Sequence, residues 1–237
     1  PGLAEARATS AMLRLLMDWD WKGADAEFAR AIAADERNPT ARSWHAFNLL
    51  VLAQLDAARE EASAAHRLDP LAPVVGAALA YTHYFSGRPR DAAAAARDVL
   101  ARDPGWAPAR NWLGLALLAQ GNGTQAVAEL QRAVEDGEGQ PLFVASLAFA
   151  LAQEGHPDSA RALVRRLEAQ RKSAYFSPVS VALVHGALGE RGRAMELLQQ
   201  GVAMRDPAVL TLARDPKADP LREDPEFERL LFRLGLR

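Results

Sequence analysis

The side chains best suited to metal or acid–base chemistry are spread along the sequence, and their spacing matches no such site. The histidines are His45, His66, His83, His156 and His185. A metal site needs ligands that converge within about 2 Å of the ion, and no HExxH motif places two histidines on one helix face. The chain contains no cysteine, which excludes disulfides, thiol catalysis and cysteine-bound metals. We therefore predict neither a metal nor another cofactor.

Other residue patterns that are catalytic in some enzymes lack the neighbouring sequence that such sites need. Gly121-Asn122-Gly123 could suggest a phosphate-binding loop, but no Gly-Lys-Ser/Thr sequence follows and a helix precedes it. We predict a tight turn between two helices instead. Carboxylates such as Asp158 and Asp206 lie at predicted helix ends, where they offset the helix dipole. Serines such as Ser146 and Ser180 lack a nucleophile-elbow sequence. The sequence therefore predicts that the chain is not an enzyme.

The overall composition indicates a helical protein with a large apolar core and no strong charge. Hydrophobic residues make up 49% of the chain and the formal net charge is −2. A protein that holds a phosphate backbone needs a basic face, so direct nucleic-acid binding is not expected. No apolar run approaches the roughly 20 residues that span a bilayer, and no signal-peptide pattern is present. We expect a cytoplasmic location without membrane insertion, and a fragment of a longer protein, because the sequence starts without methionine.

Small residues recur along the chain at a fixed interval of 34 residues. The alanine series is Ala24, Ala58, Ala92, Ala126, Ala160 and Ala194, the glycine series is Gly87, Gly121, Gly155 and Gly189, and a third small series is Ala46, Ala80, Gly114, Ala148 and Ala182. A fixed period of this size predicts a solenoid of stacked helix pairs. The glycines are expected to end the first helix of each pair in a left-handed conformation. The small residues are expected where helices approach most closely.

The period is disturbed at two places. The stretch from Ala31 to Pro39 looks about three residues longer than its counterpart ending at Pro70, and the turn at 53–56 lacks a glycine. We therefore expect the second repeat to be the least regular. After Met204 the phase is lost. This predicts helix pairs over residues 1–206 and a capping segment over 207–237. The terminal helix of that segment covers the last repeat and presents an apolar face made of Phe227, Leu230, Leu231 and Leu234.

The period resembles that of tetratricopeptide-repeat proteins, whose consensus is matched by Leu113-Gly114, Gly121, Ala126, Leu130 and Ala133. The resemblance implies an all-α, right-handed α-α superhelix of about six helix pairs with a C-terminal capping helix. Three blocks also look like the C-terminal repeat region of certain bacterial regulators. They are MDWDWKGADAEFARAI (17–32), YFSPVSVALVHGALGERGRAMELL (175–198) and ADPLREDPEFERLLFRLGL (218–236). In such proteins this region follows a winged-helix DNA-binding, class III nucleotide cyclase or serine/threonine kinase domain, none of which lies within these 237 residues.

The resemblance also implies that the first helix of each pair lines a concave surface. The positions that would face it are Ser43, Trp44, Phe47, Tyr81, Tyr84, Phe85, Asn111, Trp112 and Leu115. The predicted partner-binding residues are Trp44, Tyr81, Tyr84, Asn111 and Trp112, because aromatic side chains with polar tips anchor protein recognition. The alternative is packing onto the second helices, which we favour for Phe47 and Phe85. Repeats of this family that bind chaperones hold two carboxylates of the partner with lysines and asparagines at set positions of the first helices. Only Asn111 fits such a position here, so we do not expect that class of partner.

These observations predict a non-catalytic module that binds a protein or peptide in its concave groove and regulates an attached effector domain. Two alternatives stay open from the sequence. The array could instead associate with itself and form a homodimer through the same apolar groove. It could also sense a small ligand held inside the superhelix by aromatic and amide groups.

Overall fold

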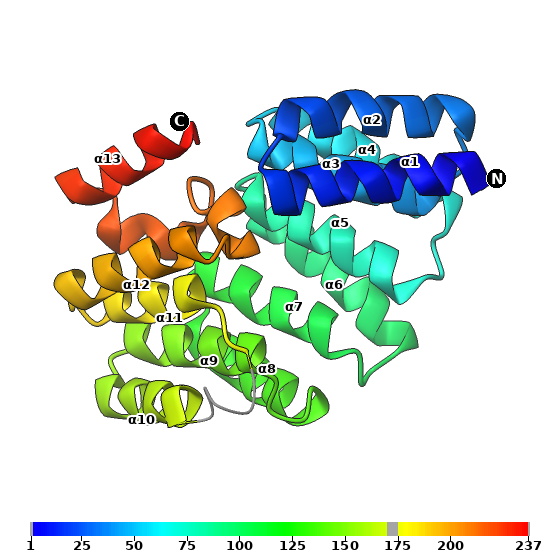
Figure 1. The fold of residues 1–237 in the computed structure, drawn as a ribbon. Coiled ribbons are helices and arrows are strands. Elements are labelled where there is room, and N and C mark those ends of the chain that lie inside the picture. The colour runs from blue at the N-terminus through cyan, green and yellow to red at the C-terminus, as the bar shows by residue number, and fades with distance from the viewer. Residues whose placement is uncertain (1, 170–174, 237) are drawn as a thin grey trace.

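The computed structural model describes residues 2–169 and 175–236, and these residues form helices and no strand. Twelve of the helices form six antiparallel pairs that follow one another along an arc (Figure 1). The pairs are α1 (Gly2–Leu13) with α2 (Trp21–Ala34), α3 (Pro39–Val51) with α4 (Leu55–Leu68), α5 (Pro73–Phe85) with α6 (Pro89–Arg102), α7 (Ala107–Ala119) with α8 (Gly123–Asp136), α9 (Pro141–Gln153) with α10 (Pro157–Ala169), and α11 (Pro178–Ala187) with α12 (Arg191–Ala203). The predicted all-α solenoid is confirmed.

Proline and a polar side chain set where the first helix of a pair begins. Pro39 opens α3, and the side chain of Asn38 accepts a hydrogen bond of 2.9 Å from the Ala41 N–H. Ser177 caps α11 in the same way, directly before Pro178. Proline suits this position because its fixed φ fits the helix and its missing N–H would have had no intrahelical partner. The chain therefore restarts a helix at each of these sites.

The turn inside every pair contains one residue in the left-handed conformation. The six residues are Trp19 (φ 57°), Ala53 (61°), Gly87 (70°), Gly121 (78°), Gly155 (79°) and Gly189 (75°), each 34 positions after the one before. The backbone of a stacked repeat therefore imposes this conformation even where the residue is not glycine. Left-handed geometry costs a residue with a Cβ more than it costs glycine.

The expected irregularity of the second repeat was wrong. The helices α3 and α4 have 13 and 14 residues, the same lengths as α5 and α6. The counterpart of Pro39 is Pro73 rather than Pro70, so the connection after α2 is not longer than the next one. The missing glycine does not change the turn either, because Ala53 adopts the left-handed conformation that glycine supplies in later repeats. The first pair is less regular, with a π-helical stretch at Arg14–Asp18.

The recurring small residues lie where the helices cross. All six alanines of the series that starts at Ala24 are fully buried. At Gly114 a Cβ atom would lie only 2.5 Å from Cγ of Leu130 on the partner helix α8. Side chains of ordinary size at these crossings would push the helices apart. The predicted role of the small series therefore agrees with the packing.

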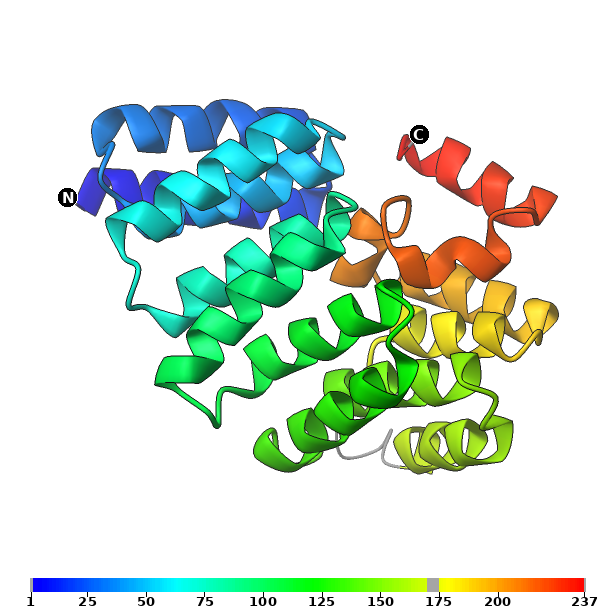
Figure 2. The same cartoon turned by 180° about the vertical axis from the view of Figure 1, so that it is seen from behind.

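The residues after the sixth pair do more than cover its open end. They comprise two 3-10 helices, Pro207–Thr211 and Pro216–Leu221, and the helix α13 (Pro225–Leu234). Asp224 caps α13, and its side chain accepts a hydrogen bond of 2.8 Å from the Glu226 N–H. Residues 205–221, here called the closing segment, run from the last pair back toward the first (Figures 1 and 2).

Leu210 of the closing segment is almost completely buried in the apolar cluster of the first pair, which contains Leu15 and Phe28. At its other side, the closing segment is tied to the sixth pair. The Ser177 hydroxyl donates a hydrogen bond of 2.5 Å to the Asp206 carboxylate. The solenoid thus closes on itself, which the sequence did not indicate. The division of the chain into domains 1–206 and 207–237 stays a prediction.

Candidate functional site

Closure of the solenoid leaves a cavity of about 490 Å³ on its concave side. Every pair contributes to its wall through its first helix, so the cavity lies at the centre of the arc. The contributing residues include Met12 from α1, Trp44 from α3, Tyr81 from α5, Trp112 from α7, Leu142 from α9 and Leu183 from α11. The closing segment supplies the remaining wall through Pro207, Ala208, Thr211, Asp215 and Lys217. The cavity volume lies within the range of about 300–1,000 Å³ that is usual for ligand sites.

Aromatic rings make one side of this cavity. The ring of Tyr81 is at the centre of the group, with centroid distances of 5.7 Å to Phe47, 4.6 Å to Phe85 and 5.0 Å to Trp112. The Phe47 and Trp112 rings meet that of Tyr81 edge to face, an arrangement that aromatic pairs prefer. Each ring is thus held in a fixed orientation by its neighbours. The wall is preorganised rather than flexible.

The closing segment supplies both charged side chains of the cavity wall, Asp215 and Lys217, and the hydroxyl of Thr211. Burial raises the pKa of Tyr81 above its ordinary value, while a hydrogen bond with Thr211 acts in the opposite direction. The phenol therefore stays neutral at physiological pH. The Nζ atom of Lys217 lies 3.5 Å from Oδ2 of Asp215, and both side chains are almost completely buried. Oδ1 of Asp215 also accepts the main-chain N–H of Lys217 at 2.9 Å.

The mouth of the cavity lies at the starts of three first helices. Thr40 of α3, Val74 of α5 and Leu142 of α9 stand at the rim, where Val74 is 64% exposed and Leu142 is 48% exposed. In contrast, Phe85 and Leu183 deeper in the wall are buried. Apolar side chains that are both exposed and next to an apolar cavity form a surface suited to binding another molecule.

The structure brings three of the five predicted partner-binding residues to this cavity. Trp44, Tyr81 and Trp112 line it, whereas Tyr84 and Asn111 are not among the described lining residues. Tyr84 is buried beside a smaller cavity of about 250 Å³. Asn111 is only 1% exposed. Partner binding by the five residues stays a prediction.

The sequence did not identify the closing-segment residues as part of the site. Thr211, Asp215 and Lys217 line the cavity, yet they follow Met204, where the repeat phase is lost. No spacing in the sequence relates them to α3 or α5. Ser43 and Phe47, in contrast, were expected to face the concave side, and both line the cavity. Phe47 also packs against Tyr81, so it both packs and lines the wall.

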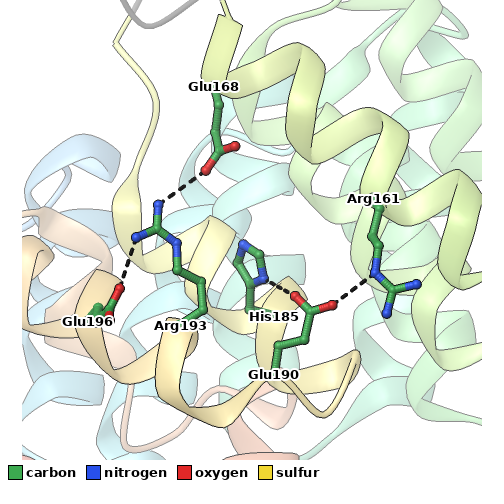
Figure 3. Close-up of polar contacts among 6 residues, drawn as sticks. All are labelled: Arg161, Glu168, His185, Glu190, Arg193 and Glu196. Atoms are coloured by element: carbon green, nitrogen blue, oxygen red, sulfur yellow. Dashed lines mark hydrogen bonds and ion pairs between the residues drawn. The ribbon is translucent and has the colours of Figure 1, made fainter.

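A second polar cluster joins the last two pairs outside the cavity (Figure 3). Nδ1 of His185 lies 2.5 Å from Oε2 of Glu190, and Nε of Arg161 donates to Oε1 of Glu190 at 2.9 Å. Burial raises the pKa of Glu190, but the hydrogen bonds and charges of His185 and Arg161 outweigh it and hold the pKa below its ordinary value. Beside it, Arg193 contacts Glu168 and Glu196. These paired groups act as a link between helices.

Neither a metal centre nor a membrane span is found in the part of the chain that the structure describes. Within residues 2–169 and 175–236, no group of three or more histidines, aspartates and glutamates is placed to hold a metal ion. No helix in the same residues combines the length and the apolar character needed to cross a membrane.

Comparison with known proteins supports the repeat assignment. A family model described as tetratricopeptide repeat matches residues 77–141. No curated protein has a sequence that matches the chain. Among solved structures, a tetratricopeptide-repeat protein from Parabacteroides merdae matches with a TM-score of 0.70 at 11% identity, covering 100% of this chain and 86% of that one.

Two further structures are similar over most of both chains. PilW, a widely conserved type IV pilus biogenesis factor, matches with a TM-score of 0.65 at 19% identity, covering 98% of this chain and 99% of that one. A thermophilic tetratricopeptide-repeat protein of Thermus thermophilus also has a TM-score of 0.65, at 20% identity, and the match covers 83% of this chain and 99% of that one. Such identities show a shared fold alone. By its fold, the chain is a tetratricopeptide-repeat solenoid, and residues 77–141 match the sequence model of that repeat.

Proposed function

We propose that the chain is a non-catalytic interaction module that binds a short protein segment at the mouth of the concave cavity. It would act within a larger cytoplasmic protein of bacterial signalling or transcription regulation. The second part of this proposal depends on the three sequence blocks that resemble the C-terminal repeat region of such regulators. The attached effector domain would carry the activity, and the repeat module would control it through the bound partner.

One observation carries the proposal. Exposed apolar side chains, Val74 and Leu142, stand directly at the rim of a cavity with preorganised aromatic walls. A partner segment lying across the rim would bury these side chains and insert an apolar anchor beside Trp44. Buried anchors of this kind supply most of the binding energy in protein interfaces.

The closed ring changes how such a segment binds. In an open superhelix, an extended peptide could run along the whole concave face. Here the closing segment already covers part of that face, with Leu210 and Thr211 buried. The accessible surface is therefore the mouth, which suits a short segment with one or two apolar anchors.

Selection from a displayed library of random peptides tests the proposal although the partner is unidentified. The full chain is immobilised, and enriched peptides are measured against wild type, Val74→Asp and Phe232→Asp. Both substitutions place a charge at an exposed apolar position, since Phe232 on α13 is 71% exposed. Val74→Asp should weaken binding at least tenfold, about 1.4 kcal/mol. Phe232→Asp should have no effect.

Two results would overturn the proposal. One is that no peptide is enriched over a blank surface. The other is that enriched peptides bind wild type and Val74→Asp equally well. Light scattering on the same samples tests self-association. A dimer that Val74→Asp converts into a monomer would assign the mouth to a second copy of the chain instead of a peptide.

A further inference from the structure

The charged side chains inside the cavity neutralise each other. Among the described residues that line it, the charged ones are Asp215 and Lys217. Their side chains are 8% and 11% exposed, and they pair with each other at 3.5 Å. An ionic group entering this space would lose its hydration without gaining a free counter-charge, which is costly in a low-dielectric interior. The cavity therefore favours an uncharged occupant.

The wall offers an occupant few hydrogen-bonding groups. The Ser43 hydroxyl oxygen has almost no accessible surface, so an occupant of the cavity cannot reach it. Thr82, another hydroxyl residue of the wall, already donates to the Ala78 carbonyl oxygen at 2.8 Å, and Thr211 forms a hydrogen bond with Tyr81. The cavity therefore favours an occupant held mainly by apolar contacts.

The rings of Trp44, Tyr81 and Trp112 determine the shape and surface of the space. They present apolar ring surfaces, and contacts with neighbouring rings hold Tyr81 and Trp112 in place, so a rigid flat molecule would contact these two rings without reorganisation. We propose that the cavity binds a small, uncharged, largely aromatic molecule. This goes beyond the partner segment at the mouth, because the occupant is a free molecule held inside the closed solenoid.

Such a molecule would touch both ends of the chain at once. The wall combines Met12 of the first pair, Leu183 of the sixth pair and Thr211 of the closing segment. A ligand that binds only when these parts are together stabilises the closed solenoid by mass action. Ligand binding in the cavity would therefore stabilise the contacts between the closing segment and the first pair.

A matched pair of fluorescent probes tests the charge preference directly. N-phenylnaphthylamine is uncharged and has one N–H donor, whereas anilinonaphthalenesulfonate has the same ring system with an added sulfonate. Titration of the full chain should show one site for the uncharged probe, with an affinity at least tenfold higher than for the anion. Equal affinities, or no saturable binding of the uncharged probe, would overturn the proposal.

Two substitutions locate the binding in the cavity. Ala78→Trp fills it from the half-buried position on α5 and should lower the affinity for the uncharged probe at least tenfold. Ala94→Trp makes the same change at an exposed position of α6 and should leave binding unchanged. Probe binding that survives Ala78→Trp would place the site elsewhere and overturn the proposal. A negative result here does not contradict peptide binding at the rim, because that proposal is tested separately with peptides and the Val74→Asp variant.

The ion pair gives an independent test. Asp215→Asn removes the negative charge but keeps an oxygen for the Lys217 N–H, and it leaves the Lys217 ammonium without its partner. Binding of the anionic probe should then rise at least tenfold relative to the uncharged one. Circular dichroism confirms that the variant is folded. An unchanged preference in a folded Asp215→Asn variant would show that this pair does not control the charge of the occupant.

Discussion

The guanidinium group of Arg205 donates a hydrogen bond to the main-chain carbonyl oxygen of Met17, 188 positions earlier in the chain. The same group lies 5.8 Å from the centroid of the Trp19 ring. Arg205 follows the sixth helix pair, and Met17 and Trp19 lie between the two helices of the first pair, in and directly after the π-helical stretch. This contact therefore joins the two ends of the solenoid, and the concave face behind it becomes a cavity.

Replacement of Arg205 by alanine should loosen this closure. The variant loses an exposed hydrogen bond and a cation–π contact, each of which contributes about 0.5–1 kcal/mol at an exposed site. Urea unfolding should show a free energy of unfolding lower by about 1 kcal/mol. Hydrogen exchange should quicken at residues 14–20 and 205–211. Arg233→Ala, at another exposed arginine, is the control, and equal exchange in both variants would contradict the role given to Arg205.

Glycine in place of Ala53 should stabilise the protein. Ala53 adopts φ 61°, and the corresponding residues in the next four pairs are glycines. Relief of the left-handed strain is worth about 1 kcal/mol, and the greater freedom of glycine in the unfolded chain offsets part of it. A higher urea midpoint with an unchanged slope checks this. A lower midpoint would mean that Ala53 is not strained.

The reverse substitution, Gly121→Ala, measures the cost of the left-handed conformation at another turn. A Cβ atom there would meet nothing within 4 Å, so Gly121→Ala adds left-handed strain without a steric clash. We expect a loss of about 1 kcal/mol in the free energy of unfolding. If Gly121→Ala were neutral, the left-handed turns would not explain the glycine series.

Alanine at Gly114 should destabilise the protein, although alanine is the better helix former. The gain in helix propensity is about 1 kcal/mol, but the Cβ would lie 2.5 Å from Cγ of Leu130 and 3.2 Å from the Ala126 carbonyl oxygen. Overpacking of this kind costs about 1–3 kcal/mol. Combining it with Leu130→Ala should cost less than the sum of the two single changes, as measured in a double-mutant cycle.

Gly192→Ala is the matched control for Gly114→Ala. Gly192 also lies in a helix, but a Cβ there would meet nothing within 4 Å. This variant should be as stable as wild type or more stable. Destabilisation of both variants by the same amount would show that the crossing at Gly114 is not the cause.

Glutamine at Glu190 should reduce stability in a pH-dependent manner. The pKa of Glu190 is lower in the folded protein than its ordinary value, so the carboxylate stabilises the fold above the unfolded pKa of about 4.3. This contribution is lost as the pH falls through the folded pKa. The free energy of unfolding of Glu190→Gln should be lower than that of wild type by at most about 1 kcal/mol at neutral pH, because the Glu190 side chain is partly exposed.

Urea unfolding should show this difference narrowing as the pH falls below the unfolded pKa of about 4.3. Glu36→Gln, at an exposed position in the connection after α2, serves as the control and should show no comparable narrowing. A difference that stays constant across the acid range would assign the effect to shape or hydrogen bonding rather than to charge.

The sequence by itself determined the repeat and its local geometry. The 34-residue series from Ala24 and from Gly87 predicted the buried crossings and the left-handed turns, because each pair in a solenoid packs mainly on its neighbours. Local spacing therefore carries the information for the helices, and for side chains such as Trp44 and Trp112 that face inward.

The tertiary structure alone decided that the solenoid closes. Contact between Arg205 and Met17 depends on the summed curvature of six stacked pairs, to which every crossing angle contributes, and no periodic signal spans that distance. The same accumulated geometry turned Tyr81 toward the cavity and Tyr84 away from it, although both lie on one helix. It also brought Lys217 from the off-phase end of the chain into a wall made by helices that lie far from it along the backbone.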